Sequence, residues 1–308
     1  MEQSQDLQMR IFLTGSTGFI GSYICQALSS QGHIVTCLIR KGSKIKLKAH
    51  RAEELHGQSI NLIEGEWTQP QNWLDQVAGH DVLINSVGII REGYRGEFDV
   101  VHDRTPIVLF QHAETVGIKK IIQISAMGAD DQAVSRFHLS KRKADRYLSS
   151  LNIHYLVIRP SFVYGYGGSS MAFFTRLAAL PITPVVGDGQ YRVQPIHIDD
   201  LVKAIVISVK DHTSESGTID AGGSEILTFD EMLDVLGRQL GTRVRHLHIP
   251  WRIMGVIAKT TDLLGGYGLI SSDELSMLRR GSVSDNSQFT AMFGFEPMPF
   301  SQGIVLSY

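Results

Sequence analysis

The chain has 308 residues, of which 43% are hydrophobic and 19% charged, and its formal net charge at pH 7 is −2. These values are ordinary for a soluble globular protein, and the small net charge excludes a strong overall attraction to nucleic acid or an anionic membrane. Two cysteines, Cys25 and Cys37, are too few for a disulfide framework. We expect them to be reduced core thiols of a cytoplasmic protein.

No targeting or membrane-spanning segment is expected in this sequence. Residues 1–10 are polar and carry acids, unlike a signal peptide. The apolar stretch 249–270 is interrupted by charges and glycines, and it falls short of the ~20 apolar residues that a membrane span needs. No residues have metal-ligand spacing, so no metal is expected. The sequence leaves open a monomer or a homodimer.

The first half of the chain alternates short apolar runs with longer helical patterns. We expect strands over residues 10–14, 34–39, 60–63, 81–85, 119–124 and 154–158, and helices over 19–31, 43–57, 98–116 and 135–151. The continuous apolar runs are typical of strands buried on both faces, so the fold class is α/β with a doubly wound parallel (Rossmann) sheet. Beyond Pro160 the loops lengthen, which predicts a Rossmann domain over 1–160 and a smaller, irregular substrate-side portion over 161–308.

A glycine-rich loop, Thr14–Gly21, joins the first expected strand to the first expected helix. The first glycine permits a tight turn, the second lets the backbone approach a pyrophosphate, and the third lets helix and strand pack closely. The helix N-terminus then offers free N–H groups to phosphates. We expect a dinucleotide here rather than a merely structural turn. The expected contacts are Gly15, Thr17, Gly18, Phe19, Ile20 and Gly21.

Arg40 and Lys41 follow the second strand, where an acid would bind the ribose 2′-hydroxyl of NAD. A guanidinium can instead bind the 2′-phosphate of NADP through charge-assisted hydrogen bonds worth ~1.5–3 kcal/mol. The pair predicts a preference for NADP(H), with NAD(H) as the alternative cofactor. The other interpretation is that both side chains are simply solvated surface.

Two further segments follow strands that end at the same edge of the sheet. Glu66 and Trp67 come after the third strand, at the usual position of an adenine contact, although a tryptophan is more often a packing residue. Ser86, Val87 and Gly88 come after the fourth strand, where the backbone would line the cofactor ribose. Both indicate a cofactor site only in the company of the glycine loop.

Taken together, these segments resemble the short-chain dehydrogenase/reductase superfamily in its extended and atypical branches. The matching pieces are Thr14–Gly21, Asn85–Gly88, Ser125–Ala129, Lys141, Arg159–Gly165, Gly187–Gly189 and Pro195–Asp200. They span most of the chain. The likeness is strongest to nucleoside-diphosphate-sugar-epimerase-like proteins and to the accessory dehydrogenase-like subunit of respiratory complex I, and it rests on Ile124–Ala129 and Val193–Asp200.

The resemblance implies a catalytic set in which one member is missing. In the family, the residue matching Ser125 hydrogen-bonds the reacting oxygen and the residue matching Lys141 holds the nicotinamide ribose, so both also contact the cofactor. A tyrosine four residues before the lysine is the general acid or base, and here that position is Phe137. General acid–base catalysis contributes typically ~10²–10⁴-fold. Its loss would slow a reductase without abolishing cofactor binding.

Other residues could compensate, and the resemblance assigns several neighbours. Tyr164 or Tyr166 could reach in from the loop that closes over the nicotinamide in relatives, and Tyr164 is the expected catalytic tyrosine. His138 should point about 100° away from Phe137 on the helix, as a surface or packing residue. The backbone of Pro160, Phe162 and Val163 would line the nicotinamide amide, and Arg192 and Phe137 would face substrate. Asp199 or Asp200 is expected to cap a helix over Leu201–Val209.

The first hypothesis is an NADP(H)-binding atypical dehydrogenase-like protein with weak or absent reductase activity, acting as a redox sensor or an assembly or accessory factor. The alternative is an active NAD(P)-dependent oxidoreductase or nucleotide-sugar epimerase/dehydratase that uses Ser125, Lys141 and a displaced tyrosine. A third is a protein-interaction module that keeps the cofactor for stability. Some relatives continue into a hydrophobic module, so membrane association would come through a partner or that missing module. The region after Ile249 is expected to be a lid and dimer surface.

Overall fold

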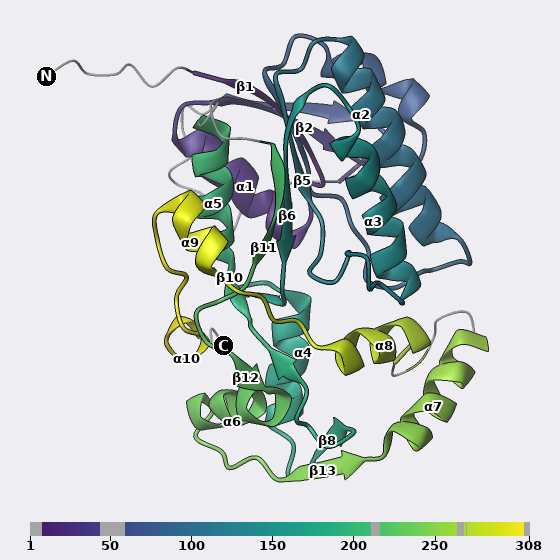
Figure 1. Ribbon diagram of the computed structural model, residues 1–308, viewed down its shortest axis with the longest axis vertical. Coiled ribbons are helices and arrows are strands. Elements are labelled where there is room, and N and C mark those ends of the chain that lie inside the picture. Colours follow the sequence, from purple (N-terminus) through teal and green to yellow (C-terminus); the bar gives the residue numbers. More distant parts are fainter. Residues whose placement is uncertain (1–7, 44–58, 211–215, 264–267, 269, 305–308) are drawn as a thin grey trace, which may run out of the picture.

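A seven-stranded parallel sheet forms the centre of the protein. The computed structural model describes residues 8–43, 59–210, 216–263, 268 and 270–304 (Figure 1). Its strands are β1 Arg10–Thr14, β2 Ile34–Ile39, β3 Ile60–Glu64, β4 Val82–Asn85, β5 Lys120–Ile124, β6 His154–Pro160 and β11 Gly217–Ala221. The strand order is β11-β6-β5-β4-β1-β2-β3, so the chain winds outward in both directions from the boundary between β1 and β4. The predicted doubly wound fold is confirmed, and ligands of such sheets bind at that boundary.

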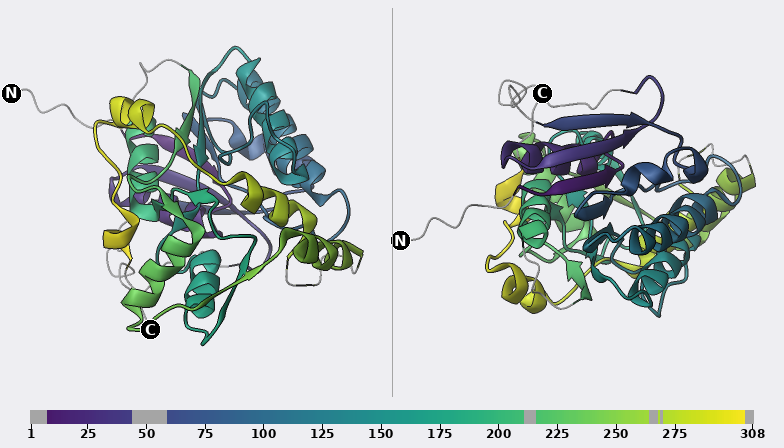
Figure 2. Two further views of the ribbon diagram at one scale, coloured as in Figure 1. Left: turned by 60° about the horizontal axis from the view of Figure 1, so that its bottom comes forward. Right: turned by 90° about the horizontal axis from the view of Figure 1, so that it is seen from above.

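Helices cover both faces of the sheet. The helices α1 Phe19–Ser30 and α5 Ile198–Lys210 lie on one face, and α2 Thr105–Thr115 and α3 Arg136–Ser149 lie on the other (Figures 1 and 2). Two short 3-10 helices, η2 Pro70–Asn72 and η3 Leu74–Val77, follow β3, and a π-helical segment, η4 Asp99–Arg104, leads into α2. Residues 44–57 of the helix expected after β2 lie outside the described residues.

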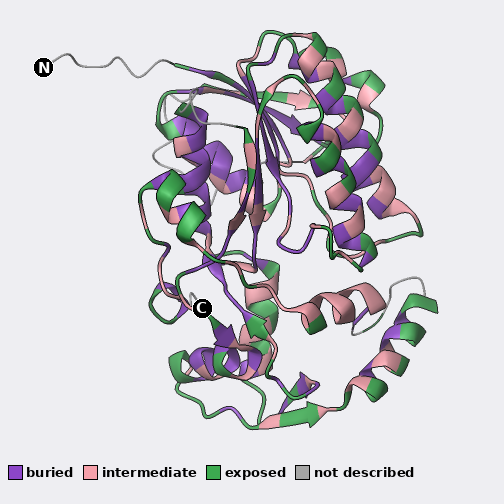
Figure 3. Ribbon diagram, in the orientation of Figure 1, coloured by how far each residue is buried: buried purple, intermediate pink, exposed green. Residues whose placement is uncertain are grey.

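The two faces bury separate apolar clusters, as the continuous apolar strands require. One cluster joins the sheet to α1 and α5 and includes Ile11, Leu13 and Ile205. The other joins it to α2 and α3 and includes Phe12 and Leu109. Successive β1 residues therefore point into different cores, because side chains alternate across a strand. Figure 3 shows the central strands buried almost throughout, whereas the edge strand β3 is partly exposed.

The rest of the second half forms a smaller lobe beyond the carboxyl ends of the strands. It contains three two-stranded sheets, which pair β7 Val163–Tyr164 with β10 Ile196–His197, β9 Arg192–Val193 with β12 Leu227–Thr228, and β8 Thr183–Val186 with β13 His246–Ile249. Its helices are α4 Ser169–Ala178, α6 Phe229–Gln239, α7 Trp251–Leu263, α8 Ser272–Arg280 and α10 Phe300–Gly303. Not all of residues 161–308 belong to this lobe. The strand β11 pairs with β6, and α5 and α9 Ser287–Phe293 contribute to the core beside the sheet.

One helix begins earlier than the sequence indicates. The helix α5 starts at Ile198, so Asp199 and Asp200 lie in its first turn instead of capping it. Acids in a first turn still stabilise the positive end of the helix dipole. The Asp200 carboxylate also accepts a hydrogen bond of 2.7 Å from the Met298 backbone N–H, which ties α5 to the C-terminal segment. Within the described ranges, no helix has the length and apolar character to cross a bilayer.

A chain of buried side-chain hydrogen bonds joins three neighbouring strands near their carboxyl ends. The Thr14 hydroxyl on β1 donates to Asn85 Oδ1 on β4 over 2.6 Å, and Asn85 Nδ2 donates to Gln123 Oε1 on β5 over 2.7 Å. All three side chains are buried. Buried polar groups are costly unless they are paired, so this chain fixes the three strands in one register beside the expected cofactor site.

We expect Asn85→Ala to lower the free energy of unfolding by roughly 1–3 kcal/mol for each buried partner left unsatisfied. Urea denaturation of the purified protein measures the loss. Asn72→Ala is the matched control, because its side-chain amide also donates a hydrogen bond, to Gln69, but at the exposed surface. Equal losses in the two variants would contradict a special role for the buried chain.

Candidate functional site

The glycine loop packs against the end of β4. Gly15 has φ of +77°, in the left-handed region that favours glycine, and a Cβ there would lie 2.7 Å from the Ser86 carbonyl carbon. A Cβ at Gly21 would overlap the Gly15 carbonyl oxygen. The Ser86 hydroxyl donates to the Thr14 carbonyl over 2.7 Å. The loop therefore closes tightly onto the strand boundary and directs the N-terminus of α1 outward.

The residues expected to choose between NADP and NAD lie in an exposed turn after β2. Arg40 and Lys41 are both exposed, and the turn closes with a hydrogen bond from the Ser43 N–H to the Arg40 carbonyl. The Gly42 N–H faces Glu64 Oε1 at 3.5 Å, so one carboxylate lies beside the two cations. The side chains are free to approach a ligand, but an acid stands close to them.

Of the two expected adenine contacts, one is exposed and the other is a core residue. Glu66 is exposed, whereas Trp67 is only 8% exposed and stacks on Trp73 with ring centroids 5.7 Å apart. The Trp67 indole N–H donates to the Val101 carbonyl over 3.1 Å. The Trp67 ring thus packs in the interior, as a tryptophan more often does.

Lys141 lies fully buried between the ends of β4 and β5. Its Nζ donates to the Ile124 carbonyl over 3.2 Å, and a Cβ at Gly88 would lie 3.4 Å from Nζ. Burial lowers the pKa of the ammonium to about 8, against the attraction of the Asp145 carboxylate, which raises it. A lysine ammonium has three donors. One is used on Ile124, and Gly88, which has no side chain, leaves room beside the ammonium.

Phe137 is in the first turn of α3, one turn before Lys141, in a buried aromatic cluster. It is 6% exposed, and Lys141 Nζ lies 5.8 Å from the centre of its ring. Phe98, His102 and His138 surround it with ring centroids 5.2–5.8 Å away. The structure therefore brings an aromatic ring without a titratable proton next to the buried lysine.

His102, which the sequence did not single out, connects this cluster to the loop after β4. The Ile89 N–H donates to His102 Nε2 over 3.0 Å, so the proton of the neutral ring must lie on Nδ1, which is 3.1 Å from Ser140 Oγ. The Ser140 hydroxyl in turn donates to the Phe137 carbonyl. Burial, and then the charge of Lys141, lower the pKa of His102 to about 2. The ring is thus a neutral spacer between the loop and α3.

Ser125 forms a buried network with Asp145 on α3. Its hydroxyl donates to Asp145 Oδ2 over 2.6 Å, and Arg159 Nε lies 3.3 Å from the same oxygen. Burial raises the pKa of the Asp145 carboxyl, while Ser125, Arg159 and Lys141 lower it. Among the described residues, no hydrogen bond reaches Asp145 Oδ1. A sequence signal for this acid existed, because it lies four residues after Lys141 and so on the same helix face.

Tyr164 lies in the core of the smaller lobe. Its ring packs against His197 and Phe300, its hydroxyl is 3.5 Å from the Pro299 carbonyl, and it is 1% exposed. Burial raises its pKa far above the ordinary value. The hydroxyl points toward α10, whereas Tyr166, the other tyrosine of this loop, is 49% exposed.

The remaining expected residues line the junction of the two lobes. Pro160 ends β6 and accepts a hydrogen bond from the Met127 N–H, and Val163 is half-buried in β7. Phe162 packs on Phe174 of α4. Arg192 is exposed on β9, and its carbonyl accepts from the Ser282 N–H. Both Arg192 and Phe162 therefore belong to the lobe that faces the sheet edge.

The helix α8 lies beside the start of α3, the helix that carries Phe137 (Figures 1 and 2). The Arg136 N–H donates to Asp273 over 2.6 Å, Arg91 pairs with Glu274 at 2.6 Å, and Arg280 pairs with Asp130 at 2.5 Å. These contacts join α8 to the Rossmann lobe at three points. The lid predicted after Ile249 would include this helix.

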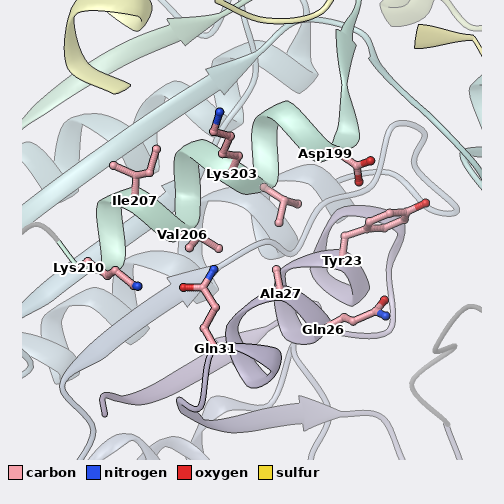
Figure 4. Close-up of a pocket in the computed structure, with 10 residues that line it drawn as sticks. Tyr23, Gln26, Ala27, Gln31, Asp199, Lys203, Val206, Ile207 and Lys210 are labelled. Atoms are coloured by element: carbon pink, nitrogen blue, oxygen red, sulfur yellow. The ribbon is translucent and has the colours of Figure 1, made fainter. Parts of the chain in front are cut away.

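A groove of about 460 Å³ lies elsewhere, between α1 and α5 (Figure 4). Tyr23 and Gln26 line it from α1, and Asp199, Lys203 and Lys210 line it from α5. The glycine loop and Lys141 do not line it. We therefore do not assign the groove to the cofactor site.

Comparison with known proteins identifies the class. Residues 11–222 match the family of NAD dependent epimerases/dehydratases. The match covers more than half of the chain, so the protein belongs to this NAD(P)-binding family, and the predicted superfamily resemblance is confirmed.

Among individual relatives, the mitochondrial NADH-ubiquinone oxidoreductase 40 kDa subunit of Neurospora crassa is 22% identical over 92% of this chain and 74% of that protein. The mitochondrial NADH dehydrogenase (ubiquinone) 1 alpha subcomplex subunit 9 of Arabidopsis thaliana is 26% identical over 81% of this chain and 62% of that protein. A ceramide reductase of Caulobacter vibrioides is 23% identical over 78% of this chain and 73% of that protein.

Solved structures support the fold. The UDP-glucose 4-epimerase of Thermotoga maritima, solved with UDP-glucose, superimposes with a TM-score of 0.73 at 18% identity, covering 96% of each chain. A tyrosine-to-phenylalanine mutant of the Bacillus cereus UDP-glucuronic acid 4-epimerase, in complex with a fluorinated UDP-glucuronic acid and NAD, also gives 0.73, at 19% identity over 96% of each chain.

The pKa of Lys141 generates a test of its role. We expect NADH affinity to fall as pH rises through about 8, because the ammonium loses a proton and with it the charge that strengthens its hydrogen bonds. Calorimetric titrations at several pH values check this, and NADH avoids the 2′-phosphate, which titrates near about pH 6.

Loss of folding cannot imitate this result. The folded pKa lies below the ordinary lysine value of 10.5, so between the two pKa values the unfolded chain binds more protons and this group adds stability as pH rises. Lys141→Gln, checked for folding by circular dichroism, should flatten the profile. A profile that keeps its step in this variant would assign the titration to another group.

Proposed function

We propose that this protein is an NADP(H)-binding, atypical member of its family with weak or absent reductase activity, acting as a cofactor-dependent sensor or accessory factor. The observation that carries the proposal is Phe137, which lies beside the buried Lys141 with no proton to give. Lys141 can hold ribose hydroxyls, whereas the Ser125 hydroxyl already donates its proton to Asp145, so the reaction still needs a proton donor.

The neighbouring side chains support this proposal, because each is poorly suited to replace a tyrosine. His102 is neutral with both ring nitrogens engaged. Burial, and next the Arg280 charge, lower the pKa of His138 to about 4, and its Nδ1 lies 2.9 Å from Ser135 Oγ. The Tyr164 hydroxyl faces Pro299. A general acid works best with a pKa near the operating pH, which none of these groups has.

The comparisons favour an accessory role without settling it. Two relatives are named as subunits of mitochondrial NADH dehydrogenases. We therefore expect a protein partner to bind the cofactor-bound form of this protein. A bound dinucleotide at about 100 times its dissociation constant would add ~2.7 kcal/mol to stability, which is enough to order an interface.

A gain-of-function variant tests the missing proton carrier. We expect Phe137→Tyr to raise NADPH-dependent turnover of carbonyl substrates by ~10²–10⁴-fold, because it restores a general acid beside Lys141. Turnover is followed as NADPH absorbance with a panel of simple and hydrophobic carbonyl compounds.

Phe98→Tyr is the matched control, because Phe98 is buried in the same cluster with its ring 5.8 Å from that of Phe137. It adds the same hydroxyl without placing it one turn before Lys141. Turnover by the unmodified protein at rates ordinary for the family would overturn the proposal, and so would an equal gain in both variants.

Cofactor choice is tested at the turn after β2. We propose that Arg40 and Lys41 bind the 2′-phosphate of NADP(H). Replacing both by serine should then weaken NADPH binding by roughly 10–150-fold, the equivalent of ~1.5–3 kcal/mol, and leave NADH binding unchanged. Calorimetry at one fixed salt concentration measures both. Similar affinities for the two cofactors in the unmodified protein would refute the assignment, since Glu64 also stands at this turn.

A second candidate function is an active oxidoreductase on a hydrophobic carbonyl, and one observation favours it. A relative of similar identity and coverage is named as a ceramide reductase. This function requires a proton carrier other than Phe137. Tyr166, exposed in the loop between the lobes, is the remaining tyrosine of that loop. Turnover by the unmodified protein that is lost in Tyr166→Phe would favour this function.

A further inference from the structure

A basic and apolar surface occupies the end of the smaller lobe, away from the nucleotide-binding sheet. It is formed by β8, β13 and α7, which lie at the lower edge of the molecule in Figure 1. We call it the distal surface and define it by its exposed residues: Ile182, Arg243, Arg245, Leu247, Arg252, Ile253, Val256 and Lys259. It lies outside both the candidate cofactor site and the groove between α1 and α5.

The helix α7 has an apolar inner face and an outward face that mixes aliphatic and basic side chains. Its inner face, with Met254 and Ala258, packs into a small core with α8. At 100° per residue, the outward residues Arg252, Ile253, Val256 and Lys259 share an arc of about 120°. On that arc Ile253 is 53% and Val256 is 64% exposed. The outward face therefore combines two aliphatic side chains with two cations.

The adjoining two-stranded sheet continues this character. The strands β8 and β13 pair in parallel with Pro184 opposite Leu247, and both residues are exposed, whereas Thr183 and Val185 point inward. Leu247 is 54% exposed, and Ile182, just before β8, is 57% exposed. Three neighbouring elements, β8, β13 and α7, thus present aliphatic side chains to solvent. Such a grouping marks an interaction surface in proteins.

Charge distinguishes this surface from the rest of the chain. Between Val235 and Thr261 the sequence contains Arg238, Arg243, Arg245, Arg252 and Lys259 and no aspartate or glutamate. All five basic residues are exposed, and none pairs with a carboxylate within the described residues. The acids of α6 that face β13, Asp230 and Asp234, contact His246 and His248 instead. A chain with net charge −2 therefore carries a local excess of positive charge along β13 and α7.

We propose that the distal surface docks on an anionic lipid bilayer, with α7 lying in the plane of the headgroups. Helices that bind in this way have aliphatic residues that enter the acyl boundary and Lys or Arg residues that pair with lipid phosphates. An unpaired cation next to an exposed aliphatic side chain, repeated along α7 and β13, fits that chemistry. Protein interfaces favour Trp and Tyr beside Arg at their centres, and the distal surface as defined contains no aromatic side chain.

Vesicle flotation tests the proposal with the full chain. The vesicles are pure phosphatidylcholine or phosphatidylcholine with about one third phosphatidylglycerol, an anionic lipid. We expect the protein to float with the anionic vesicles only, and added salt to weaken binding by screening. Replacing Arg252 by Gln and Val256 by Ser in one variant should reduce binding about tenfold or more.

The matched control variant is Arg104→Gln with Val108→Ser. These residues have the same spacing on the opposite lobe, with Arg104 at the end of η4 and Val108 in the first turn of α2, and both are exposed. Circular dichroism melting and NADPH binding should stay unchanged in both variants, because the changed side chains are at the surface and away from the cofactor site. The control should bind anionic vesicles like the unmodified protein.

Three outcomes would overturn the proposal. The first is an unmodified protein that binds neither kind of vesicle, which leaves the distal surface to a protein partner. The second is equal binding to neutral and anionic vesicles, which removes the role of the basic residues. The third is an equal loss of binding in the α7 variant and the α2 control, which removes the location.

Discussion

The burial of the Lys141 ammonium is the constraint on which the site depends. A buried charge is costly unless hydrogen bonds or an opposite charge compensate it. Here the Ile124 carbonyl accepts one hydrogen bond from the ammonium, and Asp145, one turn further along α3, supplies the opposite charge. That carboxylate must in turn be held, and Ser125 and Arg159 hold it. Burial, and next the same positive charge, lower the pKa of His102 and keep its ring neutral.

The parts of the fold that were predictable from the sequence are those that local chemistry determines. Buried strands appear as continuous apolar runs, and a glycine-rich loop marks the turn before α1. Both β1 and the loop Thr14–Gly21 could therefore be placed from the sequence, and the positive φ of Gly15 agrees with that placement. Lys141 and Phe137 were found because the family resemblance puts a tyrosine four residues before its lysine. In each case the signal lies within a few residues.

The rest depends on contacts between residues far apart in the chain. His102 meets Ser140 across 38 residues, and nothing near either residue indicates the pairing. Trp67 was predicted to contact the ligand because it follows a strand. A large apolar ring, however, gains more free energy by burial against Trp73 than by exposure at the edge of the cofactor site. The net charge is an average, and it conceals a segment with five basic residues and no acid. A net charge summed over 308 residues therefore does not exclude a local basic surface.

The helix pair α7 and α8 connects the distal surface to the neighbourhood of Phe137. The two helices share a small core, so they move together if they move at all. The ion pairs Arg91–Glu274 and Arg280–Asp130 hold α8 against the Rossmann lobe, and Asp273 accepts from the N–H of Arg136, the residue next to Phe137. Ion pairs that are partly exposed contribute little individually, about 1 kcal/mol or less. The position of α8 beside the first turn of α3 therefore depends on several weak polar contacts rather than on one strong one.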